Sequence, residues 1–231
     1  MKSEFIVPGA GVVKARRGVH IRRLSIRVAA GRGAWVNVPR GESDRAVEEF
    51  LLSRREWVEQ ARARAAECLP GLGFHDEARS REHALRVLPA PVDRPVVRRE
   101  GREVRLFIPE GEERGRVAAF AEGVLVAIYK EESRAYLPGR VDELARRFGF
   151  SRGRLSFRDN LSNWGSCSSR NNISLNVRLM KLPDELIDYV ILHELCHTVE
   201  KNHSPRFWSL VREVCPGYVG LRERLKRYHT L

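Results

Sequence analysis

The sequence predicts an α+β protein in which a β-rich N-terminal region, residues 1–111, precedes a second domain, residues 112–231. Two stretches of the N-terminal region alternate polar and apolar residues with the two-residue period of strands, and one long helical pattern separates them. The second domain opens with another helical pattern. A small antiparallel sheet and a helix with the motif His-Glu-x-x-His are predicted after it.

The first β-rich stretch predicts a hairpin followed by a helix. Residues 20–29 ("HIRRLSIRVA") and 34–39 ("AWVNVP") alternate in polarity, and the turn-prone "AGRG" of residues 30–33 separates them. Ser43 is a suitable N-cap for the helix, whose apolar residues keep helical spacing to about Glu67.

A second β-rich stretch, from about His83 to Ile108, precedes a helical pattern from about Glu112 to Phe148. Pro138 predicts a kink or a split in this helix, because proline lacks the N–H group that a helix interior uses. The segments "WVNVPRG" and "RLFIPEG" stand 70 residues apart and share one order of strand, proline, glycine and helix. We interpret them as a reused supersecondary pattern.

The composition is that of a globular protein with a strongly basic balance. The formal net charge is +12, with 36 arginines against only 6 lysines, so the surface should attract polyanions. The alternative is a bias toward arginine whose side chains pair with the 30 acids, and no nucleic-acid-binding motif appears. The four cysteines lack the C-x-x-C spacing of zinc knuckles and are expected to be reduced thiols.

Export and membrane insertion are not expected. The N-terminal "MKSEFIVPGAG" is interrupted by proline and glycine before it reaches the length of a signal-peptide core. The longest apolar run, residues 117–129, is too short to cross a bilayer. These observations predict a cytoplasmic protein without a membrane partner, and its oligomeric state is left open.

The second domain continues with three short strand candidates, "RLSFRD", "NWGSC" and "NISLNVRL", which predict the small antiparallel sheet. Pro183, a preferred first-turn residue, then opens the helix that carries the histidines. Asp184, Glu185 and Asp188 are placed favourably for the dipole of this helix.

The motif "HELCH" places His193 and His197 four residues apart, on one face of a helix, where two imidazoles can bind one metal ion. Glu194 lies on the adjacent edge, where its carboxylate can reach a metal-bound water without being a ligand itself. The metal would bring the pKa of that water near 7, and Glu194 would take its proton as general base.

A catalytic site of this kind needs a third ligand, and His203 stands six residues after His197. On a continued helix it would face elsewhere, so the helix must end first. Asn202 tolerates the left-handed conformation that ends helices, and Ser204 with Pro205 is a start signal for a new helix. His193, His197 and His203 are therefore the expected metal ligands.

Two related patterns fit less well. The three histidines have the spacing of the metzincin motif, but Glu200 stands in place of the motif's glycine. No methionine follows His203 to form a Met-turn. A thermolysin-like third ligand would fall at Gly217, with Glu213 as the nearest carboxylate, and His203 is preferred to it. Cys196 is expected to be a small buried residue of the helix.

The segments "WGSCSSRNNISLNVRL" and "LPDELIDYVILHELCHTVEKNHSPRFW" closely resemble the YgjP-like metallopeptidase family, a zincin-like group with SprT-like proteases as more distant kin. The N-terminal "RRLSIRVAAGRGAWVNVPRG" and "RREWV" carry the resemblance more weakly. It implies a zincin-like fold for residues 112–231, zinc ligands at His193, His197 and His203, and a catalytic glutamate at Glu194. The chain departs from the family pattern at Asn163, where a basic residue is common.

The resemblance also suggests where substrate binds. In zincins an edge strand beside the active helix pairs with an extended peptide, and the candidates here are Ile173, Ser174, Leu175 and Asn176, with a role as sheet core as the alternative. Tyr218 is the candidate for stabilising the oxyanion, with His229 and Arg206 as further candidates.

The predicted function is a zinc-dependent metallopeptidase that hydrolyses peptide bonds through a metal-activated water with Glu194 as general base. Its partner would be a peptide or protein substrate. The alternatives are a nucleic-acid-associated SprT-like protease and a non-catalytic DNA-binding zinc protein. A purely structural zinc module is disfavoured, because three ligands and an adjacent base leave an open position.

Overall fold

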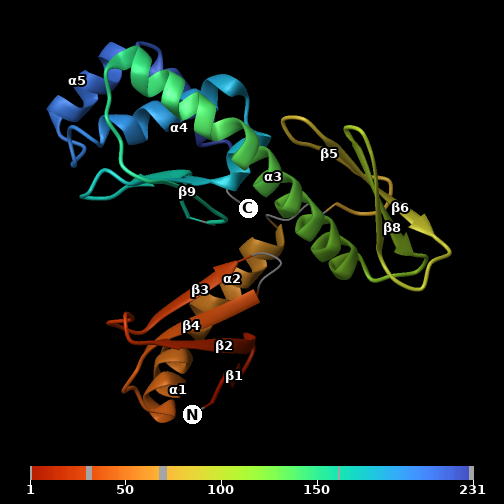
Figure 1. Cartoon of the computed structure of the whole chain (residues 1–231). Coiled ribbons are helices and arrows are strands. Elements are labelled where there is room, and N and C mark those ends of the chain that lie inside the picture. Colours follow the sequence, from red (N-terminus) through yellow and green to blue (C-terminus); the bar gives the residue numbers. More distant parts are fainter. Residues whose placement is uncertain (1, 30–32, 68–71, 161, 229–231) are drawn as a thin grey trace. The chain divides into compact units, whose positions relative to one another are not determined.

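The computed structural model describes residues 2–29, 33–67, 72–160 and 162–228. The chain divides into two compact units, residues 1–70 and residues 71–230 (Figure 1). The division falls at residue 70 and not at the predicted boundary after residue 111. The reason is that the strands before residue 111 bury Leu85, Leu106 and Ile108 in one hydrophobic core with the helix that follows them.

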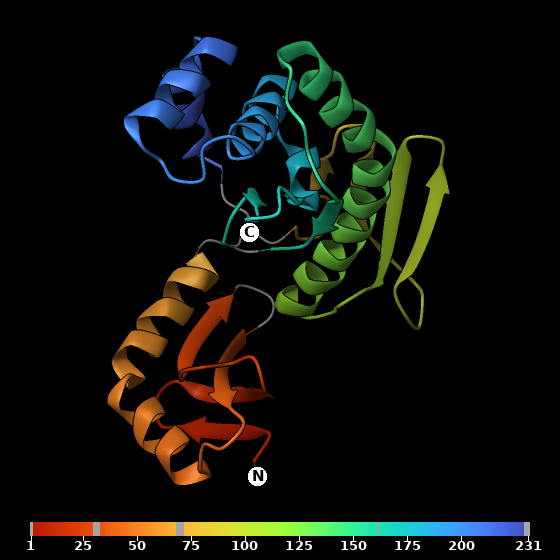
Figure 2. The ribbon, with the colours of Figure 1, turned by 60° about the vertical axis from the view of Figure 1, so that its left-hand side comes forward.

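The first unit is a four-stranded sheet with two helices on one face (Figure 2). Its strands are β1 (Glu4–Val7), β2 (Gly11–Gly18), β3 (Ser25–Ala29) and β4 (Gly33–Pro39), in the order β1-β2-β4-β3. The antiparallel pair β3 and β4 confirms the predicted hairpin, whose turn residues 30–32 lie outside the described residues.

The helices of the first unit are α1 (Asp44–Ser53) and α2 (Arg55–Glu67), in place of the single predicted helix. The Ser43 side chain caps α1 as predicted, by accepting a hydrogen bond from the Ala46 N–H. Val47, Leu51 and Val58 are buried against Val13, Val36 and Val38 of the sheet, so the unit has its own core.

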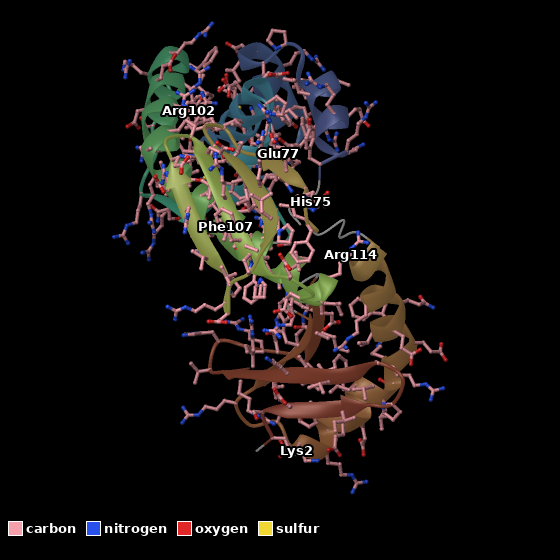
Figure 3. The ribbon with its side chains drawn as sticks, turned by 90° about the vertical axis from the view of Figure 1, so that its right-hand side faces the viewer. Lys2, His75, Glu77, Arg102, Phe107 and Arg114 are labelled. Atoms are coloured by element: carbon pink, nitrogen blue, oxygen red, sulfur yellow. The ribbon has the colours of Figure 1, made fainter. Side chains whose placement is uncertain are left out.

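The second unit begins with a sheet that repeats the arrangement of the first. Its strands are β5 (Glu77–Arg79), β6 (Ala84–Ala90), β7 (Val96–Glu100) and β8 (Glu103–Pro109), in the order β5-β6-β8-β7. In both sheets the two central strands are parallel and each outer strand is antiparallel to its neighbour. The reused sequence pattern is thus part of a four-stranded arrangement that occurs twice. The second copy can be followed in Figure 3, where Glu77 marks β5 and Phe107 marks β8.

Helix α3 (Arg114–Phe148) joins this sheet to the rest of the second unit. It runs through Pro138 without a break, so the predicted split is absent from it. Its buried residues include Val117 and Ala121 in its first half and Leu137, Val141 and Leu144 in its second. The 35-residue helix is therefore part of the core along most of its length.

A three-stranded sheet, β9 (Leu155–Arg158), β10 (Gly165–Cys167) and β11 (Ile173–Asn176), lies next. Its order is β10-β11-β9, with β10 antiparallel and β9 parallel to β11. The sheet is therefore mixed and not antiparallel as predicted, because β11 runs back beside β10 and then pairs on its other side with β9, which has the same direction.

The remaining elements are the 3-10 helix η1 (Val177–Lys181) and the helices α4 (Asp184–Cys196), α5 (Pro205–Val214) and α6 (Tyr218–Leu225). Each predicted acid of α4 pairs with an arginine from another element: Asp184 with Arg81, Glu185 with Arg224, and Asp188 with Arg140. These pairs and the buried residues of α4 hold the helix in place. No helix among the described residues is both long and apolar enough to span a membrane.

Candidate metal centre and active site

Three histidines from α4 and the segment after it converge on one point. The Nε2 atom of His203 lies 3.1 Å from Nε2 of His193 and 3.2 Å from Nε2 of His197. Nitrogen ligands of a tetrahedral zinc ion, each about 2.0–2.1 Å from the metal, stand about 3.3 Å apart. The donor set and its spacing therefore fit a zinc ion, with one tetrahedral position left for another ligand.

The backbone ends α4 inside the motif, as the spacing required. The helix stops at Cys196, and turn hydrogen bonds follow from Thr198 N–H to the Leu195 carbonyl and from Val199 N–H to the Cys196 carbonyl. Asn202 is not left-handed, since the non-glycine residues with positive φ in the described chain are His75 and Asn171. The successive turn hydrogen bonds end the helix without such a residue, so this expectation was wrong.

The new helix starts where it was predicted. Ser204 caps α5 by accepting a hydrogen bond from the Phe207 N–H, and Pro205 occupies the first turn. The cap fixes the backbone directly after His203. Phe207 and Trp208 of α5 then pack on the histidines, with Phe207 stacked on His197 and Trp208 stacked on His203.

The surroundings of His193 and His197 lower the pKa of each imidazole, mainly by burial. His197 places Nδ1 3.0 Å from the carbonyl oxygen of Glu200, and this contact orients the ring with Nε2 toward the other histidines. Burial lowers the pKa of His193 to about 3, and protonation of the neighbouring His197 or His203, like the charge of Arg222, would act in the same direction. A neutral imidazole is the form that binds a metal.

Glu194 is buried beside this cluster, with 6% of its surface exposed. Its Oε2 atom has no hydrogen-bond partner among the described residues, and burial raises its pKa to about 8. A buried carboxyl group whose pKa lies near neutrality, with one oxygen open, is suited to exchange a proton with a molecule that enters the site.

Gly165 of β10 approaches this carboxylate so closely that no side chain fits between them. A Cβ atom at residue 165 would lie 2.7 Å from both Cγ and Oε1 of Glu194. The sequence motif "WGSC" is thus the strand that lies against the acid of α4. This role of Gly165 was not predicted from the sequence, although a glycine inside a strand indicates close backbone approach.

Strand β10 is an edge strand of its sheet. The Trp164 carbonyl accepts from the Asn176 N–H, and the Ser168 N–H donates to the Asn172 carbonyl, so residues 164 and 168 face β11. Backbone groups alternate along a strand, and those of Gly165 and Cys167 therefore point to the open edge, where the Asn163 side chain donates to the Gly165 carbonyl at 2.8 Å.

A cavity of about 270 Å³ opens beside Glu194. Its wall includes Trp164 and Gly165 at the start of β10, Tyr189, His193 and Glu194 of α4, and Leu225 of α6. Tyr189 was not singled out from the sequence, although it precedes His193 by four residues and so shares its helix face. The wall is largely apolar, and Glu194 and His193 are among its polar members.

The predicted substrate-binding residues do not form an edge. Ile173, Ser174, Leu175 and Asn176 are buried, and β11 has β10 on one side and β9 on the other. The side chain of Asn176 donates to the carbonyls of Asn160 and Asn163 and accepts from the Arg178 N–H. Strand β11 therefore has the alternative role of sheet core, and β10 is the strand with an open edge.

The other candidates lie outside the cluster. Tyr218 is buried and stacks on Trp208, which in turn stacks on His203, and it does not line the cavity. Arg206 and Glu213 are exposed, and neither belongs to the histidine cluster. Cys196 is fully buried in the core, as predicted, and His229 lies outside the described residues.

The comparisons with known proteins gave one family match and two partial structural resemblances. The family model described as YgjP-like, metallopeptidase domain, matches residues 22–228. Two crystal structures of metallopeptidase zymogens resemble part of the chain. Abylysin of Pyrococcus abyssi has 23% sequence identity, and the match covers 38% of this chain and 90% of that chain with a TM-score of 0.35. Jannalysin of Methanocaldococcus jannaschii has 21% sequence identity, and the match covers 39% of this chain and 93% of that chain with a TM-score of 0.36. No curated protein matches the chain.

Proposed function

Since the chain belongs to the YgjP-like metallopeptidase family, we propose that it is a zinc-dependent peptidase in which Glu194 is the general base. The observation that carries the proposal is the convergence of three Nε2 atoms at 3.1 and 3.2 Å beside a buried carboxylate. The cluster holds three imidazoles from the described residues. It therefore leaves room for a water or a substrate oxygen, as in catalytic and not structural zinc sites.

His193, His197 and His203 would hold the zinc ion through their Nε2 atoms. When bound, zinc acts as a Lewis acid that polarises a carbonyl and lowers the pKa of water to about 7. The contact between His197 Nδ1 and the Glu200 carbonyl fixes the ring that faces the metal. This contact uses the backbone of residue 200, so a glutamate serves here where the metzincin pattern has glycine.

Glu194 would accept the proton of the attacking water at its carboxylate and pass it to the leaving amine. Its Oε2 atom has no partner among the described residues and lies beside a largely apolar cavity, so it is open to an entering water. The backbone of Gly165 packs directly against the Glu194 side chain, which limits the positions that the carboxylate can take.

The edge of β10 would bind the substrate backbone as an added strand. The Gly165 N–H and the backbone groups of Cys167 point to this edge, and Gly165 lies against Glu194. The Gly165 carbonyl accepts from the Asn163 side chain, which a substrate strand would have to displace. The adjoining cavity of about 270 Å³ would take one large apolar side chain of the substrate, because Trp164, Val190 and Leu225 line it.

The test is hydrolysis of an unfolded protein such as casein by the zinc-loaded chain. Glu194→Gln should abolish cleavage while bound zinc, measured by elemental analysis, stays at the wild-type level. Glu200→Gln is the matched control, since only the backbone of Glu200 contacts the site, and it should retain activity. Equal cleavage by the Glu194→Gln variant would reject the mechanism.

The predicted nucleic-acid binding stays a prediction that rests on the net charge of +12. A salt-dependent affinity for DNA, together with faster proteolysis when DNA is added, would support it.

A further inference from the structure

The first unit contains a second cavity, of about 360 Å³, which the proposed mechanism does not use. Its apolar wall consists of Leu24 and Ile26 at β3, Phe50 of α1 and Trp57 of α2. Arg23 and Arg54 complete the rim. The volume is that of a small ligand site and is large enough for one or two large side chains.

Trp57 is exposed more than the core of this unit requires. Its surface is 45% accessible, whereas the next residue, Val58, is fully buried in the hydrophobic core. A half-exposed tryptophan at the wall of a cavity is typical of a binding surface, because its ring offers a large apolar area at a small cost in conformational entropy.

The charged side chains that line the cavity are both arginines. Arg23 and Arg54 are exposed, and neither makes a side-chain hydrogen bond or an ion pair within the described residues. No acidic residue among those that the structure describes is part of the wall. Many other arginines of the chain are paired with acids, so two unpaired guanidinium groups at one cavity favour an anionic ligand, and guanidinium binds carboxylates in a bidentate manner.

The cavity also adjoins a free strand edge. Strand β3 is the outer strand of the sheet in the order β1-β2-β4-β3, so one of its edges has no neighbouring strand among the described residues. An extended peptide can pair with such an edge, and its side chains then alternate between the two faces. An alternating peptide would direct one set of side chains toward the cavity.

We propose that this cavity and the edge of β3 form a binding site for an extended protein segment that combines apolar and acidic residues. The apolar side chain would enter between Phe50 and Trp57, and the carboxylates would pair with Arg23 and Arg54. The role of the site as a substrate-recruiting exosite rests on the proposed peptidase function, whereas the binding itself does not. Both N-terminal segments through which the chain resembles its family, "RRLSIRVAAGRGAWVNVPRG" and "RREWV", contribute to the wall.

The test separates binding from catalysis by using the full chain with Glu194→Gln. The probe is a fluorescein-labelled octapeptide of alternating glutamate and leucine with blocked ends, and its affinity is measured by fluorescence anisotropy. The double variant Arg23→Glu/Arg54→Glu and the single variant Trp57→Ala should each weaken binding at least tenfold. Circular dichroism and thermal melting of each variant confirm the fold.

The matched control is Arg22→Glu/Arg55→Glu, which changes the net charge equally at two exposed neighbours that do not line the cavity. It should bind the peptide within about twofold of the parent. Equal loss in both double variants would mean attraction by net charge only and would overturn the proposal. So would the absence of binding, or tighter binding of a single-stranded oligonucleotide that depends on Arg23 and Arg54.

A second measurement addresses recruitment with the active enzyme. A cleavable peptide extended by the glutamate–leucine segment should have a KM at least tenfold lower than the unextended peptide, with similar kcat, and Arg23→Glu/Arg54→Glu should remove the difference. If the octapeptide binds but KM is unchanged, the site is not an exosite. If no peptide is cleaved at all, the proposed function fails while the binding result stands.

Discussion

A Cβ atom at Gly165 would come within 2.7 Å of Oε1 of Glu194, a distance that side chains do not tolerate. The glycine of β10 and the acid of α4 therefore define one wall of the site together. Gly165 does not have a positive φ, so its requirement is space and not backbone conformation. The strand edge and the carboxylate are held at a fixed separation by this contact.

Gly165→Ala should impair catalysis without removing the metal. The added methyl group would force the Glu194 side chain to rotate away, and a displacement of about 1 Å in a catalytic group can cost about 100-fold in rate. We expect kcat on a peptide substrate to fall by at least tenfold, with wild-type zinc content by elemental analysis. Ser166→Ala, at the exposed neighbour in β10, is the control and should keep its activity.

Asn176→Ala should destabilise the segment that leads into β10. The side chain of Asn176 donates to the carbonyls of Asn160 and Asn163 and is almost fully buried. Its removal leaves these partners unsatisfied, which costs about 1–3 kcal/mol for a buried group. Urea unfolding followed by circular dichroism should show a loss of stability of this size.

Asn202→Ala is the matched control for Asn176→Ala. Asn202 is exposed and does not adopt the left-handed conformation, so its replacement should change the free energy of unfolding by no more than about 0.5 kcal/mol. A large loss from Asn202→Ala, with none from Asn176→Ala, would contradict the roles that these side chains have in the structure.

His203→Ala should reduce bound zinc sharply, because one of three converging Nε2 atoms is lost. Glu213→Ala removes the alternative carboxylate, which is exposed and outside the cluster, and should leave one zinc per chain. Elemental analysis after dialysis against a weak chelator distinguishes the two. Unchanged zinc in the His203→Ala variant would show that this histidine is not a ligand.

The metal cluster was predictable from the sequence because it depends on local geometry. The spacing of His193 and His197 fixes their common helix face, and Ser204 with Pro205 marks the restart of the chain as a helix. The N-cap at Ser43 and the hairpin of β3 and β4 were predictable for the same reason.

The features that were not predicted from the sequence depend on contacts between distant segments. The order β10-β11-β9 makes β10 the edge, and no local pattern in residues 163–179 distinguishes this order from the alternative with β11 outside. The role of Gly165 depends on its contact with Glu194, 29 residues away in the sequence. The unit boundary at residue 70 depends on the shared core of β6, β8 and α3.

The stability of the metal-free protein should depend on pH through Glu194. Its pKa is raised by burial from an ordinary 4.5 to about 8, so between these values the folded state keeps a proton that the unfolded state releases. The contribution to stability is fully present below pH 4.5 and is lost as the pH rises toward 8. Glu194→Gln removes this dependence, because the amide does not titrate.

Urea unfolding of both proteins at pH 5, 6, 7 and 8, with EDTA present, measures the effect. The variant should gain stability relative to wild type as the pH rises, by at most about 1.4 kcal/mol per pH unit. The low pKa of His193 acts in the opposite direction below its ordinary value of 6.5, but both proteins share it and it cancels in the difference. Zinc should reduce the dependence, because its charge stabilises the nearby carboxylate. A constant difference between the two metal-free proteins at every pH would mean that Glu194 is ionised in the folded state throughout this range.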